Sequence, residues 1–199
     1  ELERGVGIDQ NRHHTYTVFK HSVLSLKHCP NKDWRVKFAS LLHDIAKPQT
    51  KRFDKVHGFT FHGHEDKGAR MVPNIFRRLK LPMNEKMDFV QKLVRMHLRP
   101  IPLSKEVTDS AIRRLLFEAG DDIDALMKLC RADITSKNND KVNRYLKNFD
   151  VVEAKMAEVE AKDSIRNFQP PVSGDEIIKM FNIPPSRIIG EIKEQIKEA

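Results

Sequence analysis

The stretch WRVKFASLLHDIAKP, residues 34–48, decides the fold of this chain. Its apolar residues recur at i, i+4, i+7, i+8 and i+11, the spacing of one buried face of an α-helix of about three turns. Pro48 has no backbone N–H and is expected to close that helix. The pair His43-Asp44 lies within this stretch, so two polar side chains are predicted inside the strongest helix of the chain.

Helical spacing of apolar residues continues on both sides of this stretch. Stripes of this kind lie around residues 16–26, 70–79, 89–97, 112–116, 123–130 and 142–159. The exception is residues 57–63, HGFTFHG, where glycines bracket alternating aromatics and indicate a loop or a very short strand pair. Pro73 is expected near the first turn of its helix or at a kink. Helices joined by short connections predict an all-α bundle.

The sequence changes character near residue 168, where a domain boundary is predicted. Pro170 and Pro171 stop any helix and indicate an extended connector. Two short helices are expected beyond it, the second at residues 188–196. Residues 1–167 are predicted to form the main helical domain. Residues 168–199 form a small helical tail packed on it, because about thirty residues are too few to fold alone.

Composition bounds the class of protein. Hydrophobic residues at 39% and charged residues at 32% are ordinary for a globular chain. No apolar run approaches the roughly 20 residues that cross a bilayer, and the first residues lack the apolar stretch of a signal peptide. The two cysteines, Cys29 and Cys130, fit a reducing compartment and argue against a cysteine-built zinc site. A cytoplasmic protein without membrane contact is expected, and a start other than Met suggests a piece of a longer chain.

The formal net charge of +8 is concentrated in the middle of the chain. Residues 47–105 hold fourteen Lys and Arg against five Asp and Glu, whereas residues 164–199 hold five of each. Clustered positive charge attracts polyanions such as RNA. A basic face that is merely solvated explains the same count equally well.

Polar side chains that can bind a metal fall on the predicted inward faces of further helices. Asp133 continues the apolar face of residues 126–130, and His97 continues that of residues 90–94. His21 has an inward position in an earlier helix. A buried carboxylate needs a cation or an exposed helix end nearby. These residues therefore predict a buried site of imidazole and carboxylate, the ligands of divalent metals.

Each of these residues also has a simpler interpretation. A lone buried histidine such as His97 is more often a hydrogen-bonded core residue than a ligand. Asp133 is equally acceptable as a salt-bridge partner between helices. His62 and His64, two apart on a predicted extended segment, are compatible with a loop surface. Convergence from several helices favours the metal site over separate explanations.

His21, the stretch LLHDIAKP at residues 41–48 and the pair at 132–133 give the order H…HD…D. In this order the chain resembles the HD superfamily of metal-dependent phosphohydrolases. The resemblance implies an all-α, metal-binding HD-domain helical bundle over residues 1–167 with a small C-terminal helical tail. The implied ligands of one divalent metal ion are His21, His43, Asp44 and Asp133.

The chain is similar to one branch in particular. FHGHE at residues 61–65, SAIRRLL at residues 110–116 and the stretch 172–190 resemble the HD region of bacterial CCA-adding tRNA nucleotidyltransferases and poly(A) polymerases. The catalytic head of that family needs an Asp-x-Asp metal pair on a strand. Here Asp-x-Asp occurs at residues 122–124 and opens a predicted helix. CCA addition by these 199 residues is therefore not expected. A nucleotidyltransferase domain is expected upstream, in a longer chain.

The resemblance also implies catalytic roles for Asp44, Lys47, His64 and His97. The expected cofactor is a divalent ion of manganese, nickel, cobalt, zinc, iron or magnesium, which activates water and polarises a phosphoryl group. Lys47 lies one turn beyond His43 and either neutralises the phosphate or faces solvent. His64 and His97 match positions of further ligands or of phosphate-contacting imidazoles. No second histidine accompanies His97, which favours a single tightly held ion.

Three functions remain at this point. The first is a metal-dependent phosphohydrolase acting on nucleotides or RNA ends such as 2′,3′-cyclic phosphates, as the HD portion of a tRNA nucleotidyltransferase-like protein. The alternative is the tRNA-binding body of a larger CCA-adding enzyme with a vestigial or structural metal site. The third is a regulatory sensor that binds a nucleotide without turnover.

Overall fold

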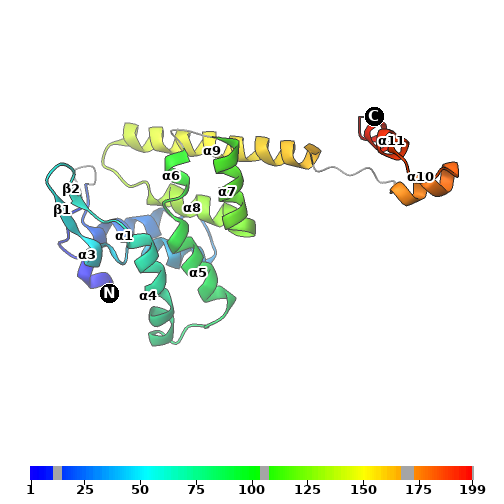
Figure 1. Cartoon of the computed structure of the whole chain (residues 1–199). Helices are drawn as coiled ribbons and strands as arrows, with labels where there is room; N and C mark the ends of the chain where they lie inside the picture. The colour runs from blue at the N-terminus through cyan, green and yellow to red at the C-terminus, as the bar shows by residue number, and fades with distance from the viewer. Residues whose placement is uncertain (11–14, 104–107, 167–172, 199) are drawn as a thin grey trace. The chain divides into compact units, whose positions relative to one another are not determined.

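The computed structural model describes residues 1–10, 15–103, 108–166 and 173–198, and its described residues are mostly helical (Figure 1). The all-α class is confirmed, with one two-stranded hairpin added. The elements are the 3-10 turns η1 (Leu2–Gly5) and η2 (Gly120–Asp122), the strands β1 (Arg52–Asp54) and β2 (Gly58–Thr60), and the helices α1 (Val18–His28), α2 (Trp34–Leu42), α3 (Lys47–Thr50), α4 (His64–Arg78), α5 (Glu85–Met96), α6 (Pro100–Leu103), α7 (Asp109–Ala119), α8 (Ile123–Asp133), α9 (Asn139–Arg166), α10 (Gly174–Phe181) and α11 (Arg187–Glu198).

The chain divides into two compact units, Glu1–Met156 and Ala157–Ala199. In the second unit, the hydroxyl of Ser173 accepts a hydrogen bond from the backbone N–H of Glu176, whose carboxylate accepts one from the N–H of Ser173. This reciprocal cap starts α10. The boundary predicted between residues 167 and 168 lies outside the described residues, so that boundary and the packing of the tail on the body stay predictions.

The first unit is built around α2, which packs against α1, α5 and α8, while α5 also packs against α4. The apolar stripes of these helices form the core, as their spacing predicts. Several large side chains in this core are less than 2% exposed, among them Leu42, Phe76, Leu93, Ile112 and Leu126. No helix in the described part of the chain is both long enough and apolar enough to cross a bilayer.

The single helix predicted over residues 34–48 is wrong in one respect, because the chain forms two helices there. α2 ends at Leu42, residues 43–46 form a turn, and α3 begins at Lys47 with Pro48 in its first turn. The missing N–H of a proline costs nothing in a first turn, where no helical acceptor exists. The pair His43-Asp44 therefore lies just beyond a helix end, where it remains buried.

α4 begins at His64, six residues before the predicted start at residue 70, so His64 lies on a helix and not on an extended segment. Gly63 precedes the helix with a φ of 74°, a conformation that glycine adopts without steric cost. Pro73 lies inside the helix and leaves the carbonyl of Ala69 without its helical donor. The Nε2 of Gln91 on α5 donates to that carbonyl at 2.9 Å, which compensates for the loss.

The hairpin β1–β2 is antiparallel, with Phe53 opposite Phe59. For residues 57–63, a loop or a very short strand pair was predicted. The stretch contains one strand, β2, whose partner strand β1 lies before it in the chain. The carboxylate of Asp54 accepts hydrogen bonds from the backbone N–H groups of Val56 and His57. The side chain of Asp54 thus stabilises the turn that joins the two short strands.

Candidate metal centre

Four of the predicted site residues come together at the ends of helices. His21 belongs to α1, His43 and Asp44 to the turn after α2, and Asp133 is the last residue of α8. The Nε2 atoms of His21 and His43 lie 2.8 Å and 3.0 Å from the same oxygen, Oδ1 of Asp133. The two Nε2 atoms are 3.1 Å apart. Three ligand atoms thus surround one point.

A second group forms beside the first. His64 begins α4 and His97 follows α5, and their Nε2 atoms lie 3.3 Å apart. Oδ1 of Asp44 is 3.2 Å from Nε2 of His64 and 3.9 Å from Nε2 of His97. Oδ2 of the same carboxylate is 3.2 Å from Nε2 of His21. Asp44 therefore stands between the two groups and contributes to both.

Helix geometry sets the orientation of these imidazole rings. In three of the histidines, Nδ1 lies 2.7 to 2.8 Å from the backbone carbonyl oxygen of the residue three positions earlier in the chain. The pairs are His43 with Ser40, His64 with Phe61 and His97 with Val94. Because a carbonyl only accepts, Nδ1 carries the hydrogen, and Nε2 faces the centre of the site. Carbonyl partners of this kind are typical of histidines that bind metals.

Burial and charge act in opposite directions on the ionisation of the site. Burial alone would lower the pKa of His43, but the charges of Asp44 and Asp133 raise it to about 10. Burial would raise the pKa of both carboxyl groups, yet His43 helps to hold each well below its ordinary value. Burial together with the charge of His43 lowers the pKa of His97 to about 3. Without metal, a proton on His43 compensates part of the negative charge.

These residues fit a divalent metal ion. The carboxylate of Asp44 is buried and surrounded by ion-pair contacts, yet neither of its oxygens accepts a hydrogen bond of directed geometry. Imidazole nitrogen and carboxylate oxygen are the ligands that zinc, manganese, iron, cobalt and nickel accept. The ligand atoms within each group, His21, His43 and Asp133 or Asp44, His64 and His97, all lie within 4.8 Å of one another.

Lys47 lies against this site and not in solvent. Its side chain is 10% exposed, and its Nζ is 2.7 Å from Oδ2 of Asp44. The same ammonium donates a hydrogen bond of 2.7 Å to Oε1 of Gln10. The solvent-facing alternative for Lys47 is therefore wrong.

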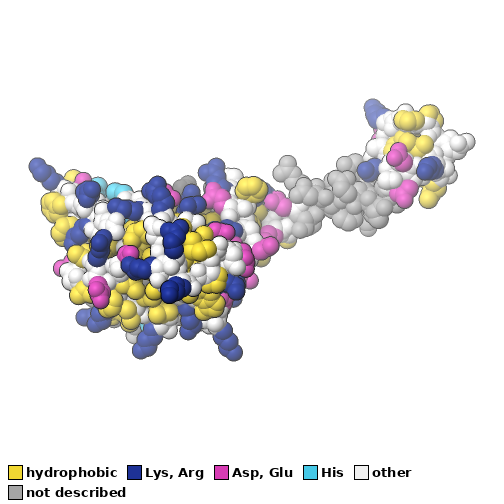
Figure 2. Space-filling view, turned by 90° about the horizontal axis from the view of Figure 1, so that it is seen from below, with side chains coloured by type: hydrophobic (Ala, Val, Ile, Leu, Met, Phe, Trp, Pro, Cys, Tyr) yellow, Lys and Arg dark blue, Asp and Glu magenta, His cyan; other side chains and the backbone are white. Residues whose placement is uncertain are grey.

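A cavity of about 550 Å³ opens over the site. Its wall includes Asp44, His64, His97 and Asp133 from the site together with Lys47. The hairpin and the segment after it line another part, through His57, Phe59, Thr60, Phe61 and His62. The volume falls in the range of sites that hold a small ligand such as a nucleotide. On the face of the Glu1–Met156 unit seen in Figure 2, Lys and Arg side chains lie between apolar ones, with fewer Asp and Glu side chains among them.

Two polar residues that contact the site, Gln10 and Thr135, were not predicted from the sequence. Gln10 is buried, accepts from Lys47 and donates through Nε2 to the carbonyl of Tyr16. Thr135 places Oγ1 2.6 Å from Nδ1 of His21. Thr135 follows Asp133 by two residues, a spacing that could have drawn attention to it. For Gln10, the sequence contains no such signal.

Uptake of a divalent ion is expected to release at least one proton at pH 7.5, because His43 must lose its proton to become a ligand. Burial opposes protonation of His21, but its hydrogen bonds with Asp133 and Asp44 raise its pKa too, so His21 adds to the count. Apparent affinity should rise with pH up to about 10, the pKa of His43 in the metal-free protein. Isothermal titration calorimetry in two buffers of different ionisation enthalpy measures the proton count. Release of no proton would show that His43 is neutral before the metal arrives.

A helical bundle that gathers histidine and aspartate side chains at helix ends defines a class of metal-binding helical domain. The family model described as HD domain matches residues 12–155, so the chain belongs to the HD domain family. That family indicates the superfamily of metal-dependent phosphohydrolases. The resemblance carried by the H…HD…D order is confirmed.

Curated relatives match the chain over its whole length. The A-adding tRNA nucleotidyltransferase of Deinococcus radiodurans is 29% identical over 207 residues, which cover 100% of this chain and 46% of that protein. The CC-adding tRNA nucleotidyltransferase of Thermus thermophilus is 27% identical over 204 residues, which cover 100% of this chain and 44% of that protein. The chain thus spans about half the length of the relatives it matches.

Proposed function

We propose that this chain is a metal-dependent phosphohydrolase that acts on nucleotides or RNA ends such as 2′,3′-cyclic phosphates. We further propose that it is the HD portion of a tRNA nucleotidyltransferase-like protein with a nucleotidyltransferase domain upstream. The observation that carries the proposal is the convergence of His21, His43, Asp44 and Asp133 beneath a cavity that also holds a buried lysine.

The proposed ligands of the first ion are His21, His43, Asp44 and Asp133. A bound divalent ion supplies Lewis acidity, which polarises a phosphoryl group and activates water. Lys47 places a positive charge at the cavity wall, where it can pair with a phosphoryl oxygen as negative charge develops. Gln10 holds the ammonium of Lys47 by accepting its hydrogen bond, and so keeps the charge on that side of the cavity.

Two roles fit His64 and His97. With Asp44 they offer three ligand atoms for a second ion, or they contact the phosphate directly as imidazoles. The number of bound ions distinguishes these roles. If both residues are ligands, His64→Ala reduces the metal content by one ion per chain. If they contact phosphate, the content stays the same and the KM for substrate rises.

The activity itself is tested with the purified chain. We expect the chain to hydrolyse a 2′,3′-cyclic nucleotide. EDTA should abolish this activity, and manganese, nickel, cobalt, zinc or iron should restore it, with metal content followed by mass spectrometry. The exposed carboxylate variant Asp124→Asn, in the first turn of α8, serves as a control that should behave like the wild type. Protein that holds metal but hydrolyses no phosphate ester under these conditions would contradict the proposal.

A second candidate is the tRNA-binding body of a larger enzyme with a structural metal site. Its support is the excess of basic residues between 47 and 105 together with the two relatives, which are tRNA nucleotidyltransferases. A separate measurement of tRNA binding over a range of salt concentrations tests this candidate. It is favoured if the chain hydrolyses no phosphate ester but binds tRNA with an affinity that falls steeply with salt.

A further inference from the structure

The hairpin β1–β2 exposes a pair of aromatic side chains. Phe53 is 72% exposed and Phe59 is 37% exposed. The two residues are directly opposite in the antiparallel register, and their rings meet edge to face with centroids 5.7 Å apart. Phenylalanine is usually buried. An aromatic pair held together at the surface is therefore a candidate contact for a partner or ligand.

The position of the pair relates it to the metal centre. Phe59 lines the same cavity as Asp44 and Asp133, while Phe53 lies on the neighbouring strand and is more exposed. The aromatic pair therefore extends from the cavity wall toward solvent. In Figure 1 the hairpin forms one edge of the first unit, beyond α3. A ligand whose phosphate lies in the cavity can reach this pair with an attached flat group.

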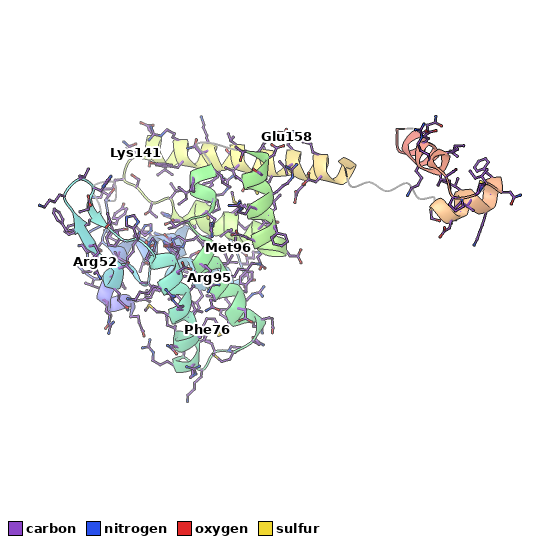
Figure 3. All side chains as sticks on the ribbon, in the orientation of Figure 1. Arg52, Phe76, Arg95, Met96, Lys141 and Glu158 are labelled. Atoms are coloured by element: carbon purple, nitrogen blue, oxygen red, sulfur yellow. The ribbon has the colours of Figure 1, made fainter. Side chains whose placement is uncertain are left out.

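The charges beside the rings are mainly positive. Nζ of Lys51 lies 3.9 Å from the centroid of the Phe59 ring. Arg52, which Figure 3 labels on the hairpin, and Lys55 in the turn are both exposed. The carboxylate of Asp54 is engaged by the two N–H groups of the turn and by His57. Aromatic rings between basic side chains are typical of surfaces that bind single-stranded nucleic acid.

We propose that this hairpin is a nucleobase platform, on which the base next to the scissile phosphate stacks on Phe59 and a neighbouring base reaches Phe53. A base on the ring of Phe59 replaces the ammonium of Lys51, which then pairs with an adjacent phosphate. The inference rests on the proposed function, because it assumes that the phosphate lies at the metal centre. It names the substrate class as a single-stranded RNA end, not a phosphate ester without a base.

Equilibrium binding tests the platform without turnover. The probe is a single-stranded RNA tetramer with 2-aminopurine as its 3′ base and a free 3′ hydroxyl, whose fluorescence falls when the base stacks. We expect quenching by the wild type. Phe59→Ala should weaken binding by roughly tenfold or more, the range for loss of one stacked base. Phe59→Trp, which keeps an aromatic face, should retain it.

The matched control is Phe117→Ala on α7, because Phe117 is 90% exposed and lines neither this cavity nor the hairpin. Phe53→Ala provides a second variant whose side chain contributes little to the core, and circular dichroism verifies that each variant folds. If Phe59→Ala and Phe53→Ala both bind the tetramer as the wild type does, the platform is wrong, and the exposed rings serve another partner such as a protein.

The same variants separate this inference from the proposed function. If the chain hydrolyses no ester while RNA binding still depends on Phe59, the hydrolase proposal fails, and the hairpin stands only as a site that stacks a base of single-stranded RNA. If hydrolysis proceeds, Phe59→Ala should raise the KM for a 2′,3′-cyclic nucleotide and leave the hydrolysis of ribose 5-phosphate unchanged. Equal loss on both substrates would contradict a base-binding role.

Discussion

Asp44→Asn is expected to weaken divalent metal binding by more than about 100-fold and to abolish hydrolysis. Changes to residues that only support metal ligands already cost about 10- to 100-fold. Asp44 has a larger role, since its two oxygens lie near His21 on one side and His64 on the other. Asparagine keeps the shape of the side chain but removes the negative charge. Calorimetry with manganese or zinc measures the affinity.

The control for this variant is again Asp124→Asn, which removes an exposed carboxylate from α8 and should change neither quantity. Thermal denaturation with and without metal provides an independent measurement, because a ligand that binds the folded state raises its stability. If metal still raises the denaturation midpoint of Asp44→Asn as much as that of the wild type, Asp44 is not a ligand.

Phe76→Ala is expected to lower the free energy of unfolding by about 3 to 5 kcal/mol, the cost of removing a buried aromatic side chain and leaving a cavity. Phe76, which Figure 3 labels on α4, has no exposed surface. Its ring contacts Phe38, with centroids 5.7 Å apart, and Trp34 at 6.5 Å. These contacts join α4 to α2, the helix that leads into the metal centre. Urea denaturation followed by circular dichroism measures the loss.

Phe117→Ala is the matched control for this prediction as well. The same atoms are removed from a ring that is 90% exposed, so the change should stay within about 0.5 kcal/mol. Equal destabilisation by the two variants would contradict the assignment of Phe76 to the core.

Apolar periodicity was sufficient to predict most helices, because packing of one helix face against a core leaves that pattern in the sequence. The pattern misplaced the end of α2 at Leu42 and the start of α4 at His64, for opposite reasons. Periodicity continues through Ile45 because that side chain is also buried, although the backbone has left the helix. His64 begins a helix whose first turn carries Glu65 and Asp66, so its start has no apolar stripe to indicate it.

The site was predictable as far as its chemistry interrupts the core. His21 and His97 are polar at positions where the helix pattern expects apolar residues, and both are buried. Gln10 and Thr135 could not be found in this way. Neither interrupts an apolar face, and each matters only because folding brings it to Lys47 or His21. The roles of all these residues in binding and catalysis remain proposals.

Asp44 has one oxygen toward each group of imidazoles, and this shared carboxylate has a thermodynamic consequence. A cation that draws on Oδ2 reduces the negative charge available at Oδ1. If His64 and His97 hold a second cation, we therefore expect negative cooperativity between the two groups, and the effect is reciprocal, since each ion changes the affinity of the other by the same factor. In that case a titration should fill one group at low metal concentration and the second only at a higher one, whereas a single binding step would assign His64 and His97 to the phosphate.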